Sequence, residues 1–333
     1  ISGDPGIGKS RLIGNWKRQL TTLHQPTKIR WIEARGLAFG RELAYDLLKS
    51  LMRSALQNPE NADKHELESG LIETLDDLLD VNHETLYLFL AHLLEIPLSD
   101  GEEEQVHKLN PSELRTQYLN AIQSFLKNLA LEQPLIIILE DLHWADASSV
   151  DLMSDLLRLS GSFPILFCLV TREDRESNGW RLITTAMEQF GPRLTRIHLE
   201  NLNEVESRSL VRQLLNINAI PEVISEIVVK KSEGNPYFIE ELVRMLINEG
   251  VLSKADEQWE ISPAIDVNKV PGSLQGLLTA RIDRLPPDAR LTLRIASVIG
   301  RNFSESVIET VMADRAPELE LMEQLSTLES IGM

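Results

Sequence analysis

The sequence predicts an α/β fold, in which a parallel sheet covered by helices is followed by a second part built from helices. Two short apolar runs, 135–139 and 163–170, read as buried strands and alternate with amphipathic helical segments. A glycine-rich loop, Gly3 to Arg11, leads directly into a helical pattern. From Asn203 onward the segments have helical rather than alternating periodicity.

The loop "GDPGIGKSR" has the spacing of a phosphate-binding loop, with Gly3 followed by Gly8, Lys9 and Ser10. Gly6 and Gly8 lack a Cβ, so the backbone can take strained dihedrals and come close to the phosphates of a nucleotide. Lys9 would supply a cation for the β- and γ-phosphates, and Ser10 a ligand for Mg²⁺. A plain flexible turn is the competing interpretation, and the rarity of so restrictive a pattern in a chain of this length disfavours it.

The helix after this loop and the residues before it also fit a phosphate-binding loop. The helix after it has apolar residues at helical spacing, namely Leu12, Ile13, Trp16 and Leu20. A phosphate-binding loop normally follows a buried strand, and here only Ile1 and Ser2 precede it. We therefore expect that the chain begins inside a strand and is a piece of a longer protein, and no targeting segment is recognisable.

The composition limits the class of protein. The 333 residues are 43% hydrophobic and 25% charged, which suffices for two or three soluble domains. The longest apolar runs are far shorter than the ~18 residues of a membrane-spanning helix, so no membrane partner is expected. A net charge of −18 disfavours nucleic acid as a partner of this segment, because Lys and Arg hold phosphate backbones. The single cysteine, Cys168, predicts a reducing, cytoplasmic setting.

The elements of the first part can be followed in order. Residues 28–35 read as a strand, and four helical segments come next: 42–57, 65–80, 84–95 and 112–132. Before the last of these, the acidic stretch 99–105 reads as a solvated loop, and Asn110 is expected to cap the helix. The remaining elements are two apolar strands, two helices and a short last strand: 135–139, 150–159, 163–170, 180–189 and 194–200.

The second part reads as two groups of helices. The first group comprises 204–215, 221–231 and 236–248, and Gly250 ends its last helix. A polar linker follows, with an expected hairpin around Trp259. The second group comprises 273–285, 288–299, 304–312 and 319–330, and we expect it to be cut short at Met333.

Two acids end the buried run "LIIILED" and form the second candidate feature of the site. Glu140 and Asp141 would lie at the carboxyl edge of a parallel sheet, where open α/β folds bind ligands. One acid can orient Mg²⁺ and the other can polarise the attacking water. The alternative is that both acids only begin a turn, and the glycine-rich loop upstream disfavours it.

Four stretches together resemble one family: "ISGDPGIGKSRL", "LIIILEDLHWAD", "EGNPYFIEELVRML" and "VPGSLQGLLTARIDRLPPDARLTLRIASVIGR". They are similar to the signal-transduction ATPases with numerous domains, in the branch found beside class III adenylate cyclases, protein kinases and LuxR-type regulators. The resemblance covers nearly the whole chain. It implies an AAA-related ATPase core at 1–202 with a helical insertion at about 41–132, a helical lid at 203–252, a linker at 253–271 and a truncated winged-helix domain at 272–333.

The resemblance also implies roles for individual residues. Lys9 would contact phosphate, Ser10 and Glu140 would hold Mg²⁺, and Asp141 would be the hydrolytic acid. Many members have Asp at the first acidic position, where this chain has Glu140, so the division of roles between the two acids stays open. The residues expected to contact ATP in the loop are Gly3, Asp4, Pro5, Gly6, Ile7, Gly8, Lys9, Ser10 and Arg11.

Three further positions match the family pattern and also have structural explanations. Arg172 follows a strand and is a candidate sensor of the γ-phosphate, although "TREDR" reads equally well as a solvated turn. Pro236 matches the position near the adenine, although a helix with Asn235 as N-cap would also begin there. For His143 in "HWAD" we favour a structural role, with Ser148 capping the next helix.

The function that we expect is an ATP-binding, slowly ATP-hydrolysing regulatory switch. Its partners would be ATP and ADP, an effector domain elsewhere in the same chain, and a second copy in nucleotide-dependent self-association. The alternative from another class is a nucleotide-gated interaction scaffold that scarcely hydrolyses ATP. A small-molecule phosphotransferase is disfavoured by the paired acids and by the long helical second half.

Overall fold

The computed structural model describes residues 1–23, 29–38, 40–57, 62–78, 83–217, 222–255, 258–261, 271–299, 305–315 and 321–331. The chain divides into two compact units. The first unit comprises Ile1–Pro5 and Lys9–Leu199, and the second comprises Gly6–Gly8 and Glu200–Met333.

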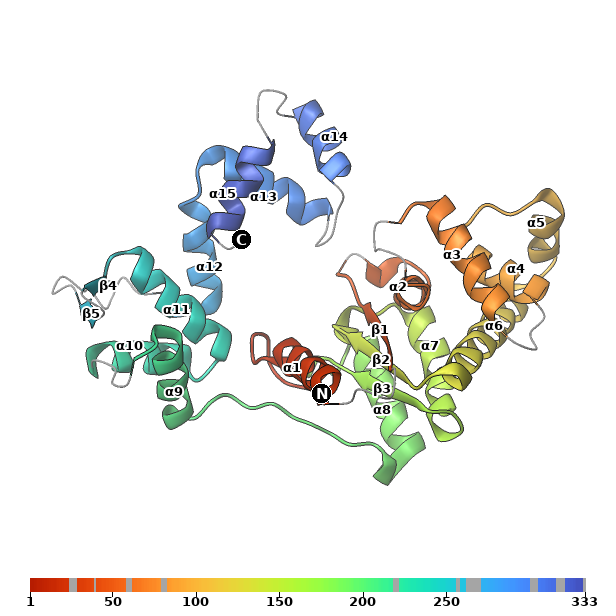
Figure 1. Ribbon diagram of the computed structural model, residues 1–333, viewed down its shortest axis with the longest axis horizontal. Helices are drawn as coiled ribbons and strands as arrows, with labels where there is room; N and C mark the ends of the chain where they lie inside the picture. Colours follow the sequence, from red (N-terminus) through yellow and green to blue (C-terminus); the bar gives the residue numbers. More distant parts are fainter. Residues whose placement is uncertain are drawn as a thin grey trace. The chain divides into compact units, whose positions relative to one another are not determined.

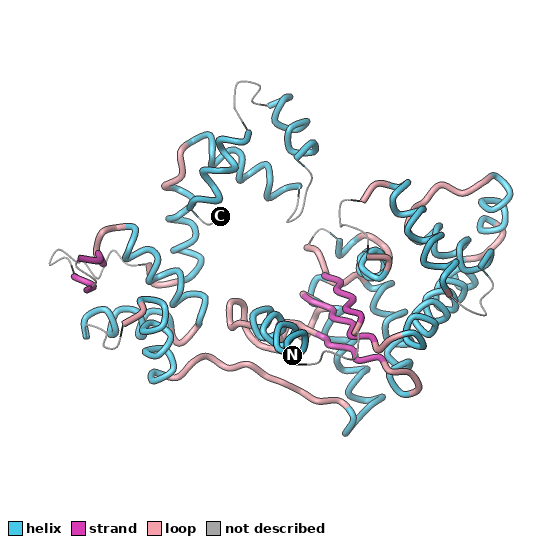
Figure 2. The backbone as a smooth tube through the Cα atoms, in the orientation of Figure 1, coloured by secondary structure: helices cyan, strands magenta, loops and turns pink. Residues whose placement is uncertain are grey.

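A parallel three-stranded sheet forms the centre of the first unit (Figures 1 and 2). The strands lie in the order β1 (Arg30–Arg35), β2 (Leu135–Glu140), β3 (Ile165–Leu169). The register pairs Arg30 with Leu135 at one end and Arg35 with Glu140 at the other. Helices pack on both faces of the sheet, so the apolar residues of its central strand β2 are buried, and the predicted α/β class is confirmed.

The predicted last strand, 194–200, is wrong as a full strand. Ser2 forms isolated parallel bridges to Thr171 on one side and His198 on the other. The backbone N–H of Ser2 donates to Ile197 O at 2.9 Å, and Leu199 N–H donates to Ser2 O at 2.9 Å. Segment 194–200 therefore pairs only with Ser2, through a single bridge, and this pairing is too short to form a β-strand.

Helices cover both faces of this sheet. Helix α1 (Lys9–Leu23) packs through Ile13 against Ile136, Ile138 and Val170 on one face. A larger apolar cluster on the other face unites α2, α3, α4, α6, α7 and α8 with the sheet. The bounds of these helices are α2 Asp46–Ala55, α3 Lys64–Asp77, α4 His83–Leu93, α6 Pro111–Glu132, α7 Ala147–Leu156 and α8 Asn178–Phe190.

Two helix starts test the capping predictions. Asn110 caps α6 as predicted and accepts hydrogen bonds from Ser112 N–H and Glu113 N–H, both at 3.0 Å. The acidic stretch 99–105 is wrong as a loop, because α5 (Asp100–His107) begins there. A capping box between Ser99 and Glu102 stabilises this helix, and Val106 in its last turn is buried.

The second unit is built mainly from helices. A compact apolar cluster joins α9 (Glu204–Leu215), α10 (Glu222–Ser232) and α11 (Pro236–Asn248). The expected hairpin around Trp259 is present as β4 (Leu252–Ala255) and β5 (Gln258–Ile261), and Trp259 Nε1 donates to Leu215 O at 2.8 Å. The remaining helices are α12 (Leu274–Asp283), α13 (Pro287–Ile299), α14 (Glu305–Arg315) and α15 (Leu321–Ile331).

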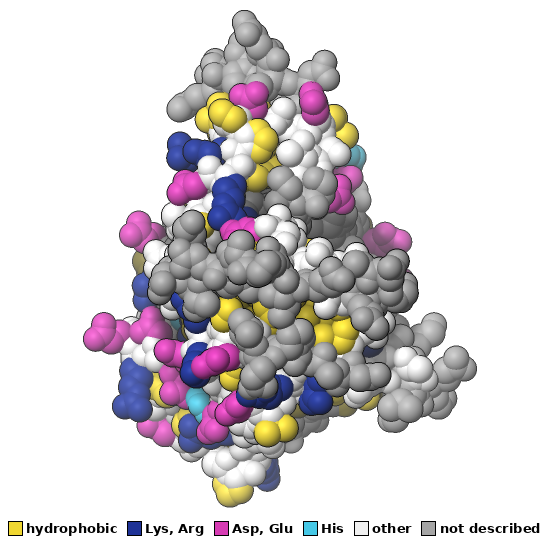
Figure 3. All heavy atoms as spheres, turned by 90° about the vertical axis from the view of Figure 1, so that its left-hand side faces the viewer, with side chains coloured by type: hydrophobic (Ala, Val, Ile, Leu, Met, Phe, Trp, Pro, Cys, Tyr) yellow, Lys and Arg dark blue, Asp and Glu magenta, His cyan; other side chains and the backbone are white. Residues whose placement is uncertain are grey.

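Charged side chains of both signs are mixed on the face that Figure 3 presents. In the second unit, Arg208 pairs with Glu204 at 2.9 Å and Arg284 pairs with Glu249 at 2.6 Å. Among the described residues, no helix combines the length and the apolar character needed to cross a bilayer. Most of linker 253–271 and parts of 272–333 lie outside the described residues, so the winged-helix assignment stays a prediction.

Candidate nucleotide-binding site

The glycine-rich loop has the backbone that a phosphate-binding loop requires. Gly6 has φ +77° and Gly8 has φ +101°, in the left-handed region that side chains other than glycine rarely adopt. A Cβ added at Gly8 would meet no atom within 4 Å, so the constraint there comes from φ and not from a clash. Helix α1 begins at Lys9, so its free N–H groups lie at the end of this loop.

The Lys9 side chain folds back over the loop. Its Nζ donates to Gly3 O at 2.7 Å and to Asp4 O at 2.8 Å. Burial lowers the pKa of Lys9, the charge of Arg172 lowers it further, and nearby carboxylates oppose the shift. The ammonium group therefore lies among loop carbonyls, from which it can turn to a bound phosphate.

Ser10 and Glu140 meet at the start of α1 and the end of β2. The Ser10 hydroxyl donates to Glu140 Oε2 at 3.2 Å, across 130 positions of sequence. A hydroxyl and a carboxylate are oxygen ligands of the kind that Mg²⁺ prefers. This contact between the loop and the acidic edge of the sheet fits the predicted metal site.

An arginine that the sequence analysis missed joins both acids. Arg35 Nε donates to Asp141 Oδ2 at 2.6 Å, and Arg35 Nη2 lies 3.5 Å from Glu140 Oε2. The parallel register of β1 and β2 places Arg35 opposite Glu140. The sequence shows that Arg35 ends a predicted strand, but only the pairing of β1 with β2 brings it beside the acids.

Asp141 marks a sharp change in the direction of the chain. It has a left-handed backbone with φ +50°, and the short helix η2 (Leu142–Trp144) follows it. His143 in that turn is 4% exposed, and neither ring nitrogen has a hydrogen-bond partner among the described residues. Burial lowers the pKa of His143, the charge of Arg172 lowers it further, and Asp141 opposes the shift.

The cap of the next helix differs from the expectation. Asp146, not Ser148, is the N-cap of α7 and accepts from Ser149 N–H at 2.8 Å. Its carboxylate is buried and also accepts from Tyr45 N–H at 2.9 Å and Leu47 N–H at 3.3 Å. The Asp146 carboxylate is a better cap here than the Ser148 hydroxyl, because it can accept hydrogen bonds from several backbone N–H groups at once.

The remaining predicted residues occupy different places. Arg172 follows Thr171 at the same sheet edge, and its charge acts on Lys9 and His143. Arg11 is exposed on α1. Pro236 is the first residue of α11 in the second unit, where Asn235 caps the helix by accepting from Phe238 N–H at 3.1 Å.

These features define a class: an α/β protein with a phosphate-binding loop and an acidic pair at the carboxyl edge of its sheet. Residues 1–170 match the family model of the AAA ATPase domain. The chain belongs to this family of nucleotide-binding P-loop ATPases. Residues 203–258 match a second model, Domain of unknown function (DUF8739).

Two individual matches have low sequence identity to this chain. The chain is 23% identical over 317 residues to the uncharacterized protein R02095 of Rhizobium meliloti (strain 1021), a match that covers 94% of this chain. The chain spans only 28% of the length of that relative. A solved structure of Drosophila ORC bound to DNA matches with a TM-score of 0.35 and 14% identity, over 98% of this chain and 79% of that one.

Proposed function

We propose that this chain is a regulatory module that binds Mg²⁺-ATP at the glycine-rich loop and hydrolyses it slowly. The observation that carries the proposal is the hydrogen bond between Ser10 and Glu140, which joins the loop to the acidic end of β2. The loop alone would fit any phosphate ligand. Its contact with an acid at a sheet edge is what a metal-dependent nucleotide site needs.

Each residue then has one task in this site. Backbone N–H groups of the loop and Lys9 bind the phosphates, and Ser10 with Glu140 holds Mg²⁺, which withdraws charge from the reacting phosphate when bound. Asp141 accepts the proton of the attacking water. Arg172 stabilises charge on the terminal phosphate, and Pro236 contacts the adenine.

The proposed switch extends through the rest of the chain. Residues 203–252 act as a helical lid, residues 253–271 link it onward, and 272–333 form part of a winged-helix domain. The state of the lid is transmitted to an effector domain elsewhere in the longer, cytoplasmic protein, with self-association in one nucleotide state. This segment binds no nucleic acid.

A nucleotide-gated scaffold with little hydrolysis is the second candidate, and one observation favours it. Arg35 Nε donates to Asp141 Oδ2 at 2.6 Å, so the carboxylate that would act as the base already accepts a hydrogen bond from within the chain. That oxygen is then occupied and cannot accept a hydrogen bond from an attacking water on the same side. Turnover measured by phosphate release separates the two functions.

The test of nucleotide binding is Lys9→Ala, with Lys17→Ala as the matched control. Lys17 lies on the same helix, two turns further along, and pairs with Glu33. Calorimetry with Mg²⁺-ATP and Mg²⁺-ADP should find strong loss of affinity in Lys9→Ala and parental affinity in Lys17→Ala. Parental affinity in a folded Lys9→Ala protein would mean that the loop is not the site.

A further inference from the structure

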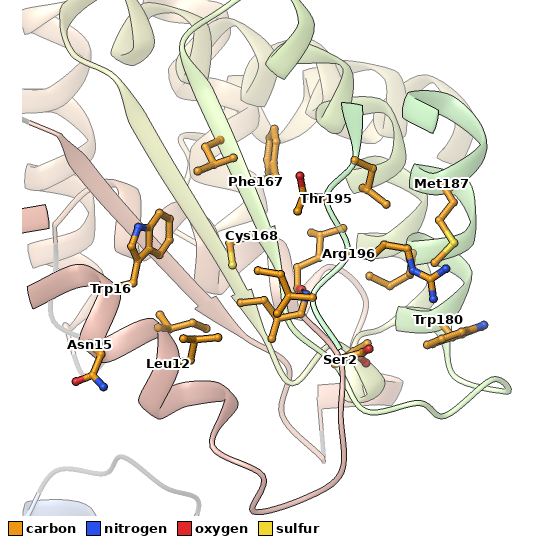
Figure 4. Close-up of a pocket in the computed structure, with 18 of the residues that line it drawn as sticks. Ser2, Leu12, Asn15, Trp16, Phe167, Cys168, Trp180, Met187, Thr195 and Arg196 are labelled. Atoms are coloured by element: carbon orange, nitrogen blue, oxygen red, sulfur yellow. Dashed lines mark hydrogen bonds between the residues drawn. The ribbon is translucent and has the colours of Figure 1, made fainter. Parts of the chain in front are cut away.

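Two cavities of similar volume lie in the first unit, and their linings differ in chemistry. One, of about 560 Å³, lies between α1, β3 and α8, and apolar side chains such as Leu12, Trp16 and Met187 line it (Figure 4). The other, of about 570 Å³, lies among the helices that connect β1 to β2 along the chain, and we call it the polar cavity. The polar side chains of its lining are Tyr45, Lys49, Lys64, His92, Glu95, Glu103 and Tyr118.

Three aromatic rings form one continuous wall of the polar cavity. The rings of Tyr45 and Tyr118 meet edge to face with their centroids 5.2 Å apart, and the ring of His92 stacks on Tyr118 with the centroids 6.0 Å apart. Tyr118 is buried, whereas Tyr45 and His92 are half-buried. Leu93 and Ile96 add apolar side chains to the lining. Rings and aliphatic groups together favour the flat, apolar body of an aromatic ligand.

A hydrogen bond within this wall determines which nitrogen of His92 is a donor. His92 Nδ1 and the Tyr118 hydroxyl lie 2.5 Å apart. Burial lowers the pKa of His92, so its ring is neutral near pH 7, and burial raises the pKa of Tyr118, so the phenol keeps its proton. Among the described residues the Tyr118 hydroxyl has no second partner, so it donates to Nδ1. The proton of the His92 ring therefore lies on Nε2, and the ring brings an N–H donor to the lining.

Lys49 is the least exposed of the four charged residues in the lining. Its side chain is 23% exposed, and its ammonium group pairs with Glu95, whose side chain is 65% exposed. Lys64 and Glu103 are also exposed. Glu95 is thus largely hydrated already, whereas Lys49 depends on a nearby negative charge. An anion that enters the polar cavity can therefore replace Glu95 as the partner of Lys49.

Two residues of the lining have backbone conformations that large side chains rarely adopt. Tyr45 has φ +64° and Glu95 has φ +60°. Glu95 lies just after α4, where glycine is the usual residue, and its carboxylate bonds to Lys49. The backbone N–H of Tyr45 donates to the buried carboxylate of Asp146 at 2.9 Å, which holds the strained turn in place. Strain of this kind is typical of residues that are positioned for a ligand.

We propose that the polar cavity binds a small aromatic carboxylate. The carboxylate accepts hydrogen bonds from Lys49 Nζ and His92 Nε2–H, and the ring packs against the aromatic wall. A dianion such as phosphate is disfavoured, because Glu95 and Glu103 bring negative charge to the same lining. The volume lies within the ~300–1,000 Å³ that is usual for small-molecule sites. None of these residues belongs to the glycine-rich loop or to the acidic pair, so the inference goes beyond ATP binding and does not depend on it.

The test measures the binding of three probes of similar shape and different charge to the 333-residue chain without nucleotide. The probes are benzoate, benzamide and benzylamine, and their binding is followed by ligand-observed NMR. Benzoate should bind with a Kd of about 0.1–1 mM, and the other two should bind at least tenfold more weakly. Benzamide or benzylamine binding as tightly as benzoate would overturn the proposal, and so would the absence of benzoate binding at ~10 mM.

Two substitutions should change benzoate affinity in opposite directions. Lys49→Met removes the charge that pairs with the carboxylate, so benzoate should bind at least tenfold more weakly. Glu95→Gln removes the competing carboxylate, so benzoate should bind several-fold more tightly. Lys127→Met is the matched control, because Lys127 lies on α6 over the ring of Phe163, and it should leave the affinity at the parental value.

Tyr118→Phe tests the position of the His92 proton. Without the phenol, Nδ1 loses its donor and the ring proton is no longer fixed on Nε2, so benzoate should bind several-fold more weakly. Thermal unfolding establishes that each variant is folded. Parental affinity in folded Lys49→Met, or weaker binding in both Lys49→Met and Glu95→Gln, would mean that the ion pair only joins α2 to the end of α4, and the proposal would fall. No step uses nucleotide, so a failed ATP-binding assay leaves this test intact.

Discussion

Replacing Arg35 by glutamine should lower the Mg²⁺ concentration that nucleotide binding requires. The guanidinium lies 3.5 Å from Glu140 Oε2, so its charge competes with Mg²⁺ for that carboxylate. With a Mg²⁺–oxygen bond of ~2.1 Å, the two charges are at most about 5.6 Å apart. Coulomb's law for charges of one and two at that distance in water gives about 1.5 kcal/mol of repulsion. Its removal corresponds to roughly a tenfold tighter Mg²⁺ dissociation constant.

The assay is a Mg²⁺ titration of ATP binding, followed by calorimetry at low salt because the Debye length is only ~8 Å at 0.15 M. Arg35→Lys keeps the charge and should behave like the parent. Lys17→Gln removes a charge that pairs with Glu33 and should also change nothing. An unaltered Mg²⁺ requirement in folded Arg35→Gln, or an equal shift in Arg35→Lys, would refute the competition between Arg35 and the metal.

Three further substitutions test the site and its supports. Asp141→Asn should keep near-parental ATP affinity and lower turnover roughly a hundredfold, whereas Glu140→Gln should weaken Mg²⁺-dependent binding itself; the reverse pattern would exchange the two roles. Asp146→Ala should cost about 3 kcal/mol and lower Tm by roughly 6–12 °C, because this buried carboxylate caps both α7 and α2; a calorimetric shift below ~2 °C would contradict that. Gly8→Ala should cost about 1–2 kcal/mol in urea unfolding because of its φ of +101°, while Gly14→Ala inside α1 should not destabilise, and equal effects would discount the backbone argument.

Local patterns were enough to predict the sheet and most helices. The run 135–139 is apolar throughout because helices cover both faces of the sheet at β2. The two residues of the capping box of α6, Asn110 and Glu113, lie three positions apart. Both signals are therefore contained in short stretches of sequence. The glycine-rich loop and the two acids were predicted in the same way, and the functional roles of these residues stay predictions.

The features that were missed depend on partners far away in sequence. Arg35 acquires its place only when β1 aligns with β2, 106 positions from Asp141. Asp146 rather than Ser148 caps α7, because its carboxylate also accepts hydrogen bonds from two backbone N–H groups at the start of α2. The sequence around Asp146 does not show that α2 lies beside it. Residues 194–200 have the composition of a strand, but a strand forms only against a paired segment of similar length, and here the paired residue is Ser2 alone.

The buried carboxylate of Asp146 also identifies where this protein could be cut and rejoined. It fastens the first turn of α2 to the start of α7, in the segment after β2. Among the described residues, the backbone N–H groups that donate to this carboxylate belong to Tyr45, Leu47 and Ser149, which lie outside the stretch from the end of α2 to the start of α6. Chimeras that exchange this stretch for a shorter connection should keep the sheet edge intact as long as the junction lies beyond Leu48, while a junction inside the first turn of α2 should release it.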